Sequence, residues 1–214
     1  MSCSQIAMPA TLLLLLASGT ACHPKSAPPP GGYRTVARNL QRDTDRAKHE
    51  NAQALELIDK GKWEDAEKPL KDALTADLTF GPAHNNLGRV YYEQGKFYLA
   101  AWEFEYAAKL MPNEAQPRNN LGLVLEETGK LDEAIEQYDQ GLALNPQDAQ
   151  IIGNAARARL RRGDHDTQVK LLLQKVIDRD TRPQWLQWAR ENLVLLEAHN
   201  ARAATAPTSV PAPR

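Results

Sequence analysis

Residues 81–114 have the sequence GPAHNNLGRVYYEQGKFYLAAWEFEYAAKLMPNE, which contains two stretches that each suit a helix. Apolar and small residues recur every three or four positions in both stretches, as on the buried side of an amphipathic helix. Gly95 separates the stretches, and glycine readily adopts the left-handed conformation that ends many helices. Pro112 follows the second stretch. The segment therefore predicts two helices joined by a short turn.

The turn glycine of this segment recurs along the chain. The series is Gly61, Gly95, Gly129 and Gly163, and each follows the one before it by 34 residues, which is the repeat length of this chain. A 34-residue repeat that contains two helices is the signature of the tetratricopeptide repeat (TPR), and the glycines keep this spacing, so the chain resembles the TPR family. The spacing predicts four units, over about residues 47–80, 81–114, 115–148 and 149–182.

Residues at the signature positions carry this resemblance. The second unit has all but one of them, with His84 in the tryptophan position: Leu87, Gly88, Tyr91, Ala100, Phe104, Ala107 and Pro112. The fourth unit is degenerate, because positions that are normally apolar or small hold Arg159, Gln168 and Lys175. The resemblance implies an all-α fold, a TPR solenoid of three good repeats and one degenerate helix-turn-helix repeat.

Residues 183–200 predict one more helix. Its apolar residues recur at helical spacing, with two tryptophans beside them: Leu186, Ala189, Leu193 and Leu196, with Trp185 and Trp188. A solenoid needs a terminal helix that covers its last repeat, so we expect a capping helix. A tryptophan-rich binding helix is the alternative.

The beginning of the chain predicts export. Residues 1–21 hold no Lys, Arg, Asp or Glu, and their apolar run over residues 12–17 is shorter than the about 20 residues that span a bilayer. Such a segment is typical of a secretory signal. Cys22 follows small residues and resembles the lipidated cysteine of bacterial lipoproteins. Ordinary cleavage, with Cys22 as an unmodified thiol, is the alternative.

Three further segments complete the expected domain organisation. Residues 22–38 are rich in proline and glycine and predict a tether. Residues 39–200 comprise the solenoid with its capping helix. Residues 201–214 are rich in alanine, threonine and proline, and predict a disordered tail.

The composition excludes several classes of function. Among 214 residues, 26 are Lys or Arg and 27 are Asp or Glu, so the chain lacks the basic balance of a general nucleic-acid binder. Two cysteines exclude a disulfide scaffold and a four-cysteine zinc site. The five histidines show no metal-ligand spacing, and no catalytic motif occurs. We therefore expect no enzyme activity, cofactor, metal or nucleic-acid partner.

The TPR resemblance implies a right-handed superhelix whose first helices line a concave groove that commonly takes a peptide. Asn86, Asn120 and Asn154 occupy one equivalent position in successive units. Their amides could hydrogen-bond a peptide backbone. Support of helix packing is the alternative. The carboxylate clamp of chaperone-binding TPR domains is not expected, because only Asn120 has a counterpart in it.

Charged residues are uneven along the expected groove. Arg89 faces Glu93 one turn later, while Glu126 and Glu127 are expected to make the centre acidic, on a solvated helix face. Arg157 and Arg161 follow Asn154 at about one-turn spacing and could bind a carboxylate of a partner. The alternative is a solvated, basic helix end.

A second candidate surface is an aromatic stripe. Tyr98, Trp102 and Tyr106 recur every four residues on the second helix of the best-formed unit, away from its signature positions. Such a stripe is expected on the convex side, where aromatic residues anchor partners. Packing against a neighbouring helix or the N-terminal segment is the alternative.

Together these features predict a non-catalytic scaffold or adaptor that binds peptide segments of envelope machinery. It is similar to bacterial TPR lipoproteins of pilus or secretion assembly. We expect a lipid anchor in the outer membrane, on its periplasmic face, since His23 rather than Asp follows Cys22. The alternatives are a soluble periplasmic peptide receptor or chaperone without an anchor and, third, the substrate-docking part of an enzyme system.

Overall fold

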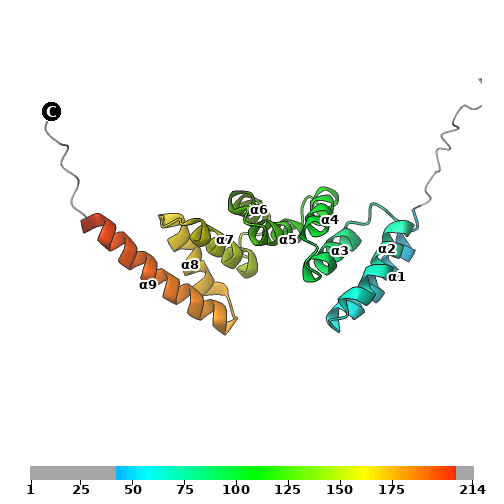
Figure 1. The fold of residues 1–214 in the computed structure, drawn as a ribbon, viewed down its shortest axis with the longest axis horizontal. Coiled ribbons are helices and arrows are strands. Elements are labelled where there is room, and N and C mark those ends of the chain that lie inside the picture. The colour runs from blue at the N-terminus through cyan, green and yellow to red at the C-terminus, as the bar shows by residue number, and fades with distance from the viewer. Residues whose placement is uncertain (1–41, 206–214) are drawn as a thin grey trace, which may run out of the picture. The chain divides into compact units, whose positions relative to one another are not determined.

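The computed structural model describes residues 42–205, which form nine helices and no strand (Figure 1). Eight of the helices form four consecutive pairs: α1 (Thr44–Asp59) with α2 (Trp63–Ala76), α3 (Gly81–Glu93) with α4 (Phe97–Leu110), α5 (Ala115–Glu127) with α6 (Leu131–Leu144), and α7 (Ala149–Arg162) with α8 (Thr167–Arg179). The last helix, α9 (Pro183–Thr205), follows them. The predicted all-α arrangement of four helix pairs and a terminal helix is confirmed. The predicted signal segment, Cys22 and the tether lie outside the described residues.

Each pair turns at the glycine that the repeat spacing singles out. The four turn glycines all have a positive φ, from 69° at Gly61 to 97° at Gly163. No atom lies within 4 Å of a Cβ built on any of them. The backbone conformation therefore requires these glycines. A side chain would have room at each position, but it would strain the left-handed backbone.

A different kind of glycine brings the two helices of a pair together. A Cβ on Gly88 would lie 2.6 Å from the Phe104 ring, and a Cβ on Gly122 would lie 2.5 Å from the Tyr138 ring. Both aromatic side chains are buried. In the second and third pairs the second helix thus packs its aromatic ring onto the backbone of the first, as the signature positions predict.

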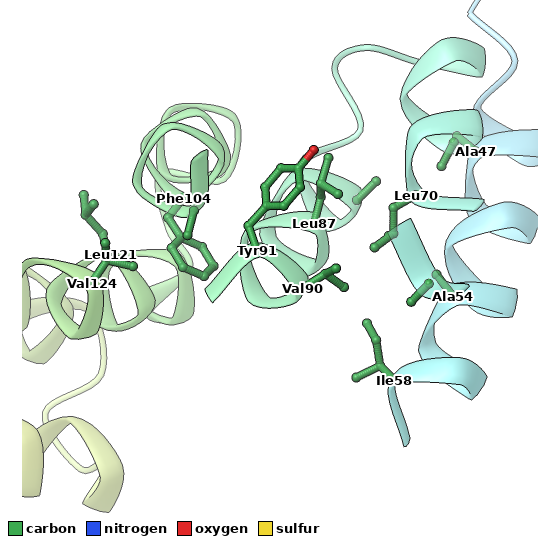
Figure 2. Packing of buried hydrophobic residues seen from close by; sticks show 14 residues of the cluster. Ala47, Ala54, Ile58, Leu70, Leu87, Val90, Tyr91, Phe104, Leu121 and Val124 are labelled. Carbon is green, nitrogen blue, oxygen red and sulfur yellow. The ribbon is translucent and has the colours of Figure 1, made fainter. Parts of the chain in front are cut away.

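Apolar contacts also join successive pairs. Figure 2 shows part of one buried cluster, from Ala54 and Leu70 of the first pair, through Leu87 and Tyr91, to Leu121 of the third. A second cluster extends from α6 to α9. The first helices contact one another in succession, α1 with α3, α3 with α5 and α5 with α7.

The fourth pair departs from the regular spacing. Helix α8 begins at Thr167, two residues later than one repeat length from the start of α6 would place it, and the Asp166 side chain caps it by accepting from Val169 N. The buried residues of α8 include Val169, Leu173 and Val176, each one residue after a signature position, together with Leu172, which occupies one. Gln168 and Lys175 are exposed, which explains why they occupy positions that are small or apolar elsewhere.

Helix α9 covers the last pair, as expected of a cap. Ala189 and Leu196 are buried, and polar residues of the helix are exposed: Gln184, Gln187, Arg190, Glu191 and Glu197. The helix continues to Thr205, so the predicted tail is wrong for residues 201–205. None of the helices in the described part of the chain combines the length and apolarity needed to cross a bilayer.

Candidate functional site

A ladder of asparagine pairs joins the first helices. In each pair an amide Nδ2 donates to the Oδ1 of an asparagine 35 residues earlier: Asn86 to Asn51 (2.9 Å), Asn120 to Asn85 (3.0 Å) and Asn154 to Asn119 (2.9 Å). All three donors are buried. The prediction that these amides are available to a peptide is thus corrected for their donor groups, which bind the preceding helix. This is the packing role considered as the alternative.

The ladder ends at the cap. Gly153 and Trp188 lie one repeat length after the acceptor Asn119 and the donor Asn154, but neither carries an amide side chain. Instead the Trp185 ring packs on Gly153, where a Cβ would lie 2.8 Å from the ring. An apolar contact therefore replaces the amide pair between α7 and α9, and it requires glycine for the close approach.

Between α5 and α7 the surface is closed by a buried ion cluster around Glu126, whose side chain is 1% exposed. Arg157 donates to this carboxylate through two bonds, Nε to Oε1 (2.8 Å) and Nη2 to Oε2 (2.9 Å). Arg161 Nη1 donates to Oε1 and Tyr138 Oη to Oε2, each at 2.9 Å. The carboxylate that the two arginines were predicted to receive from a partner is thus supplied by the chain itself.

The pKa of Glu126 follows from this geometry. Burial alone would raise the pKa of the carboxyl group. The hydrogen bonds and positive charge of Arg157, with the bonds from Arg161 and Tyr138, outweigh burial and lower the pKa below its ordinary value of 4.5. Glu126 is therefore an ionised, paired carboxylate, and the expectation of a solvated acidic centre is wrong for it.

The neighbouring arginines are also bound internally. Arg159 is buried, and its Nη2 donates to both carboxylate oxygens of Asp139, at 2.8 and 2.7 Å. Arg162 pairs with Asp132 and Asp164 across the turn. The arginines at the end of α7 are therefore ion-paired. The alternative of a solvated basic helix end is wrong for the buried Arg159, whereas Arg161 and Arg162 are exposed as it predicts.

An open hollow lies on the first helices. Its volume is about 380 Å³, and α3, α4, α5 and α7 line it with polar and apolar side chains that include Asn85, Arg89, Tyr92, Gln116, Asn120 and Leu123. Arg89 forms no ion pair with any carboxylate of residues 42–205, although Glu93 lines the same hollow. The structure thus leaves Arg89 and Asn120, of the predicted groove residues, facing an open hollow. Tyr92, Gln116 and Leu123 were missed.

The aromatic stripe on α4 is divided. Tyr98 and Trp102 are exposed, so for these two packing on a neighbouring helix is wrong, while the N-terminal segment, the other alternative, lies outside the described residues. Tyr106 packs edge-on against the buried His84, with ring centroids 4.7 Å apart, as that alternative predicts. His84 in turn contacts Glu103 Oε2 (2.7 Å) and the Leu78 carbonyl oxygen (2.9 Å).

The described residues contain no group of three or more His, Cys, Asp and Glu side chains that could hold a metal ion. They do bring together two histidines that lie one repeat length apart in the sequence. The rings of His165 and His199 stack with centroids 4.0 Å apart. The repeat spacing could have predicted this contact between the α7–α8 turn and α9.

Comparison with known proteins identifies the repeats. Two profiles of the Tetratricopeptide repeat family match residues 51–120 and 115–148. A search of curated proteins gives no match.

Solved structures share the fold. Pseudomonas aeruginosa PilF has a TM-score of 0.62 at 21% identity, over 79% of this chain and 80% of that one. The first TPR domain of Spaghetti (RPAP3), bound to the HSP90 peptide SRMEEVD, has a TM-score of 0.55 at 19% identity, over 57% and 97%. A mutant O-GlcNAc transferase of Thermobaculum terrenum has a TM-score of 0.58 at 24% identity, over 64% of this chain and 27% of the enzyme. At these identities the likeness shows the fold.

TPR domains are protein–protein interaction modules, and the structure has an open hollow on its first helices. The constant glycine spacing, the aromatic rings packed on Gly88 and Gly122, the four helix pairs and the two profile matches agree. Residues 51–148 are tetratricopeptide repeats, and the structure continues the same succession of helix pairs from Thr44 to Arg179.

Proposed function

We propose that this chain is a non-catalytic adaptor that binds a peptide segment of a partner protein in the hollow between α3 and α7. The proposal rests on Arg89, a half-buried cation that forms no ion pair with a carboxylate of the described residues. Arg89 lines the hollow together with Tyr92 and Leu123. A hollow of about 380 Å³ lies at the small end of ligand pockets, and it suits a few side chains of an extended chain.

The repeat itself explains why Arg89 has no ion-pair partner within residues 42–205. Arg89 and Arg157 occupy the same position in the second and fourth units. Arg157 reaches back 31 residues to Glu126, whereas the residue 31 positions before Arg89 is the buried, apolar Ile58. The arginine that pairs with a carboxylate at one junction therefore has no such partner at the other, among the residues that the structure describes. A carboxylate of the bound peptide would take that place through a charge-assisted hydrogen bond.

The test uses fluorescein-labelled ten-residue peptides that contain two leucines and either one glutamate or one glutamine. We expect Arg89→Ala to weaken binding of the glutamate peptide about tenfold, or about 1.4 kcal/mol. The same variant should leave binding of the glutamine peptide unchanged. Arg190→Ala, on the exposed face of α9, is the matched control. Equal losses for both peptides, or for both variants, would reject the proposed contact.

The proposal includes a location, which rests on sequence alone. We propose that the adaptor is held by a lipidated Cys22 at the periplasmic face of a bacterial outer membrane, since Thr20 and Ala21 precede Cys22 as in lipoproteins. Mass spectrometry of the mature N-terminus tests this location. Diacylglyceryl and acyl additions on Cys22 are expected. An unmodified Cys22 would favour the soluble periplasmic receptor, with the same peptide-binding hollow.

A further inference from the structure

Two tryptophans of α9 line a small pocket, which we call the tryptophan notch. Its lining consists of Trp185, Trp188 and the exposed Gln184 of α9 with Arg157 of α7, and its volume is about 160 Å³. Both tryptophans are half-buried. None of the four residues lines the hollow on the first helices. The tryptophan notch is therefore a site separate from the proposed peptide site.

Contacts on several sides of Trp185 hold the walls of the tryptophan notch in place. The ring of Trp188 meets it edge-on, with centroids 5.3 Å apart and an angle of 72° between the ring planes. The backbone of Gly153 lies against the ring, since a Cβ there would be 2.8 Å away. The Cζ atoms of Arg157 and Arg182 lie 5.3 and 4.7 Å from the ring centroid. The walls are thus in place before a ligand binds, which lowers the entropy cost of binding.

A basic side chain does not suit the tryptophan notch. The ring of Trp185 already lies beside the guanidinium groups of Arg157 and Arg182, so a lysine or arginine of a partner would meet positive charge. No carboxylate lines the notch to offset this charge. The charged residues that follow the notch along α9, Arg190 and Glu191, have opposite signs. The surroundings therefore disfavour a cation.

An acidic side chain does not suit the notch either. Arg157 donates through Nε and Nη2 to Glu126. Arg182 donates through the same two atoms to Asp180. A carboxylate of a partner would thus face arginines that are already paired, and it would lose water against two aromatic rings. The occupant that suits the notch is an uncharged, apolar side chain.

The hydrogen-bonding groups of the tryptophan notch are mostly donors. Neither indole Nε1–H of Trp185 and Trp188 has an acceptor among residues 42–205, and neither nitrogen is buried, so both can donate to a ligand. Arg157 is a donor only, and among the four lining side chains only the Gln184 amide has an acceptor oxygen. A segment rich in backbone carbonyl groups and poor in N–H groups complements such a lining. Proline provides this composition, because it keeps its carbonyl group and has no backbone N–H.

A proline-rich segment also matches the aromatic walls. Such a segment adopts the polyproline II helix, which has no internal hydrogen bonds and leaves its carbonyl groups free. Aromatic-lined grooves bind this helix at low entropy cost because it is preformed. The volume of the notch is well below the about 300–1,000 Å³ of small-molecule pockets, so it suits a ring or two of a longer segment.

We propose that the tryptophan notch binds a proline-rich segment of a partner protein in the polyproline II conformation. A proline ring lies between Trp185 and Trp188, and the indole Nε1–H groups donate to carbonyl groups of the segment, with the Gln184 amide beside them. Helix α9 is then both the capping helix and the tryptophan-rich binding helix, which the sequence poses as alternatives.

The experiment uses the full chain and two uncharged, fluorescein-labelled peptides of twelve residues with blocked ends. One repeats Pro-Pro-Ala four times, and the other repeats Val-Thr-Ala four times. Fluorescence anisotropy measures the dissociation constants. Nuclear magnetic resonance of the ¹⁵N-labelled chain follows the indole Nε1–H signals of its four tryptophans, which are assigned from Trp→Phe variants.

We expect the proline peptide to bind at least tenfold more tightly than the comparison peptide. The indole signals of Trp185 and Trp188 should shift on binding, while those of Trp63 and Trp102 should not. Trp188→Phe keeps an aromatic ring and removes the Nε1–H donor, so it should weaken binding at least threefold. Trp188→Ala should weaken it at least tenfold. Circular dichroism checks that both variants fold, and Trp102→Phe, at an exposed tryptophan of α4, is the matched control and should change nothing.

Several results would overturn the proposal: absence of saturable binding, equal affinity for the two peptides, unshifted signals of the two notch tryptophans, or an equal loss in the α4 control. Two further measurements address other occupants. Residues 206–214 contain three prolines, and a shift of the two signals on their deletion, without peptide, would assign the notch to this chain's own tail. A shift on dilution of the chain alone, absent from Trp188→Ala, would assign it to a second copy.

Discussion

The junction between α3 and α5 and the junction between α5 and α7 have the same backbone plan and opposite surfaces. Tyr92 and Leu123 line an open hollow at the first junction. The residues one repeat length later are Glu126 and Arg157, which form a buried ion pair that closes the second. Both junctions share the asparagine pair and the aromatic ring on glycine. A repeat therefore fixes helix placement, while two positions per junction decide whether its surface is open.

The largest effect should come from removing the charge at the closed junction. Glu126→Gln leaves Arg157 and Arg161 without their carboxylate and is expected to reduce the free energy of unfolding by about 3 kcal/mol. Chemical denaturation measures it. Glu127→Gln, which changes the adjacent exposed residue, is the control and should change stability by less than about 0.5 kcal/mol. Equal effects of the two variants would show that the cluster does not hold the junction.

The difference in stability between the wild type and Glu126→Gln should depend on pH. The pKa of Glu126 is lowered in the folded state from its ordinary 4.5, so its contribution is complete above that pH and is lost as the pH falls through the folded value. The difference in melting temperature between wild type and Glu126→Gln should be constant around neutral pH and should become smaller in acid. A gap that is unchanged down to pH 2.5 would contradict the assigned pKa direction.

The packing of an aromatic ring on a glycine, which α3–α4 and α5–α6 share, allows these two helix pairs to be compared directly. Gly122→Ala forces the added Cβ against Tyr138, which cannot yield easily because its hydroxyl is bonded to Glu126. We expect a loss of about 2 kcal/mol. Gly88→Ala meets Phe104, which has no hydroxyl to hold it, and should cost about 1 kcal/mol. Thermal unfolding measures both. A larger loss at Gly88 would contradict the anchoring of Tyr138.

The asparagine ladder should give the smallest effect. Asn154→Ala leaves the fully buried Oδ1 of Asn119 without its donor, and about 1 kcal/mol is expected to be lost. Asn120→Ala exposes Asn85, which is only half-buried, so water can replace the donor and the loss should be smaller. Denaturation in urea compares the two. The reverse order would show that the ladder energies do not follow burial.

Much of the fold was predictable because it follows from local sequence. The four glycines mark turns that need a left-handed residue, and Gly88 with Phe104 marks a close approach, so helix positions and pairing could be read directly. The start of α8 was less predictable. Asp166 caps that helix two residues later than the repeat spacing implies, and such an insertion is not visible in the glycine interval.

The surface was less predictable because charges act over long sequence distances. From the sequence alone Glu126 is predicted to be solvated. Only the structure shows that Arg157, 31 positions later, donates a hydrogen bond to it. The asparagines were recognised as a series, but a one-residue offset decides which amide donates to which, and this offset depends on the packing of neighbouring units. Arg89 was named from its repeat position and lines the hollow, but the sequence pattern did not give the reason, which is that its internal partner position is apolar.

Arg157 has a consequence for how the molecule unfolds. In most solenoids each unit interacts with its immediate neighbours, so stability behaves like a one-dimensional chain of independent links. Arg157 binds Glu126 on α5 and lies 5.3 Å from the ring centroid of Trp185 on α9, so one side chain of α7 couples both of its neighbours. The carboxy-terminal half should therefore unfold as one cooperative block, and amide exchange in α5 should report the loss of α9.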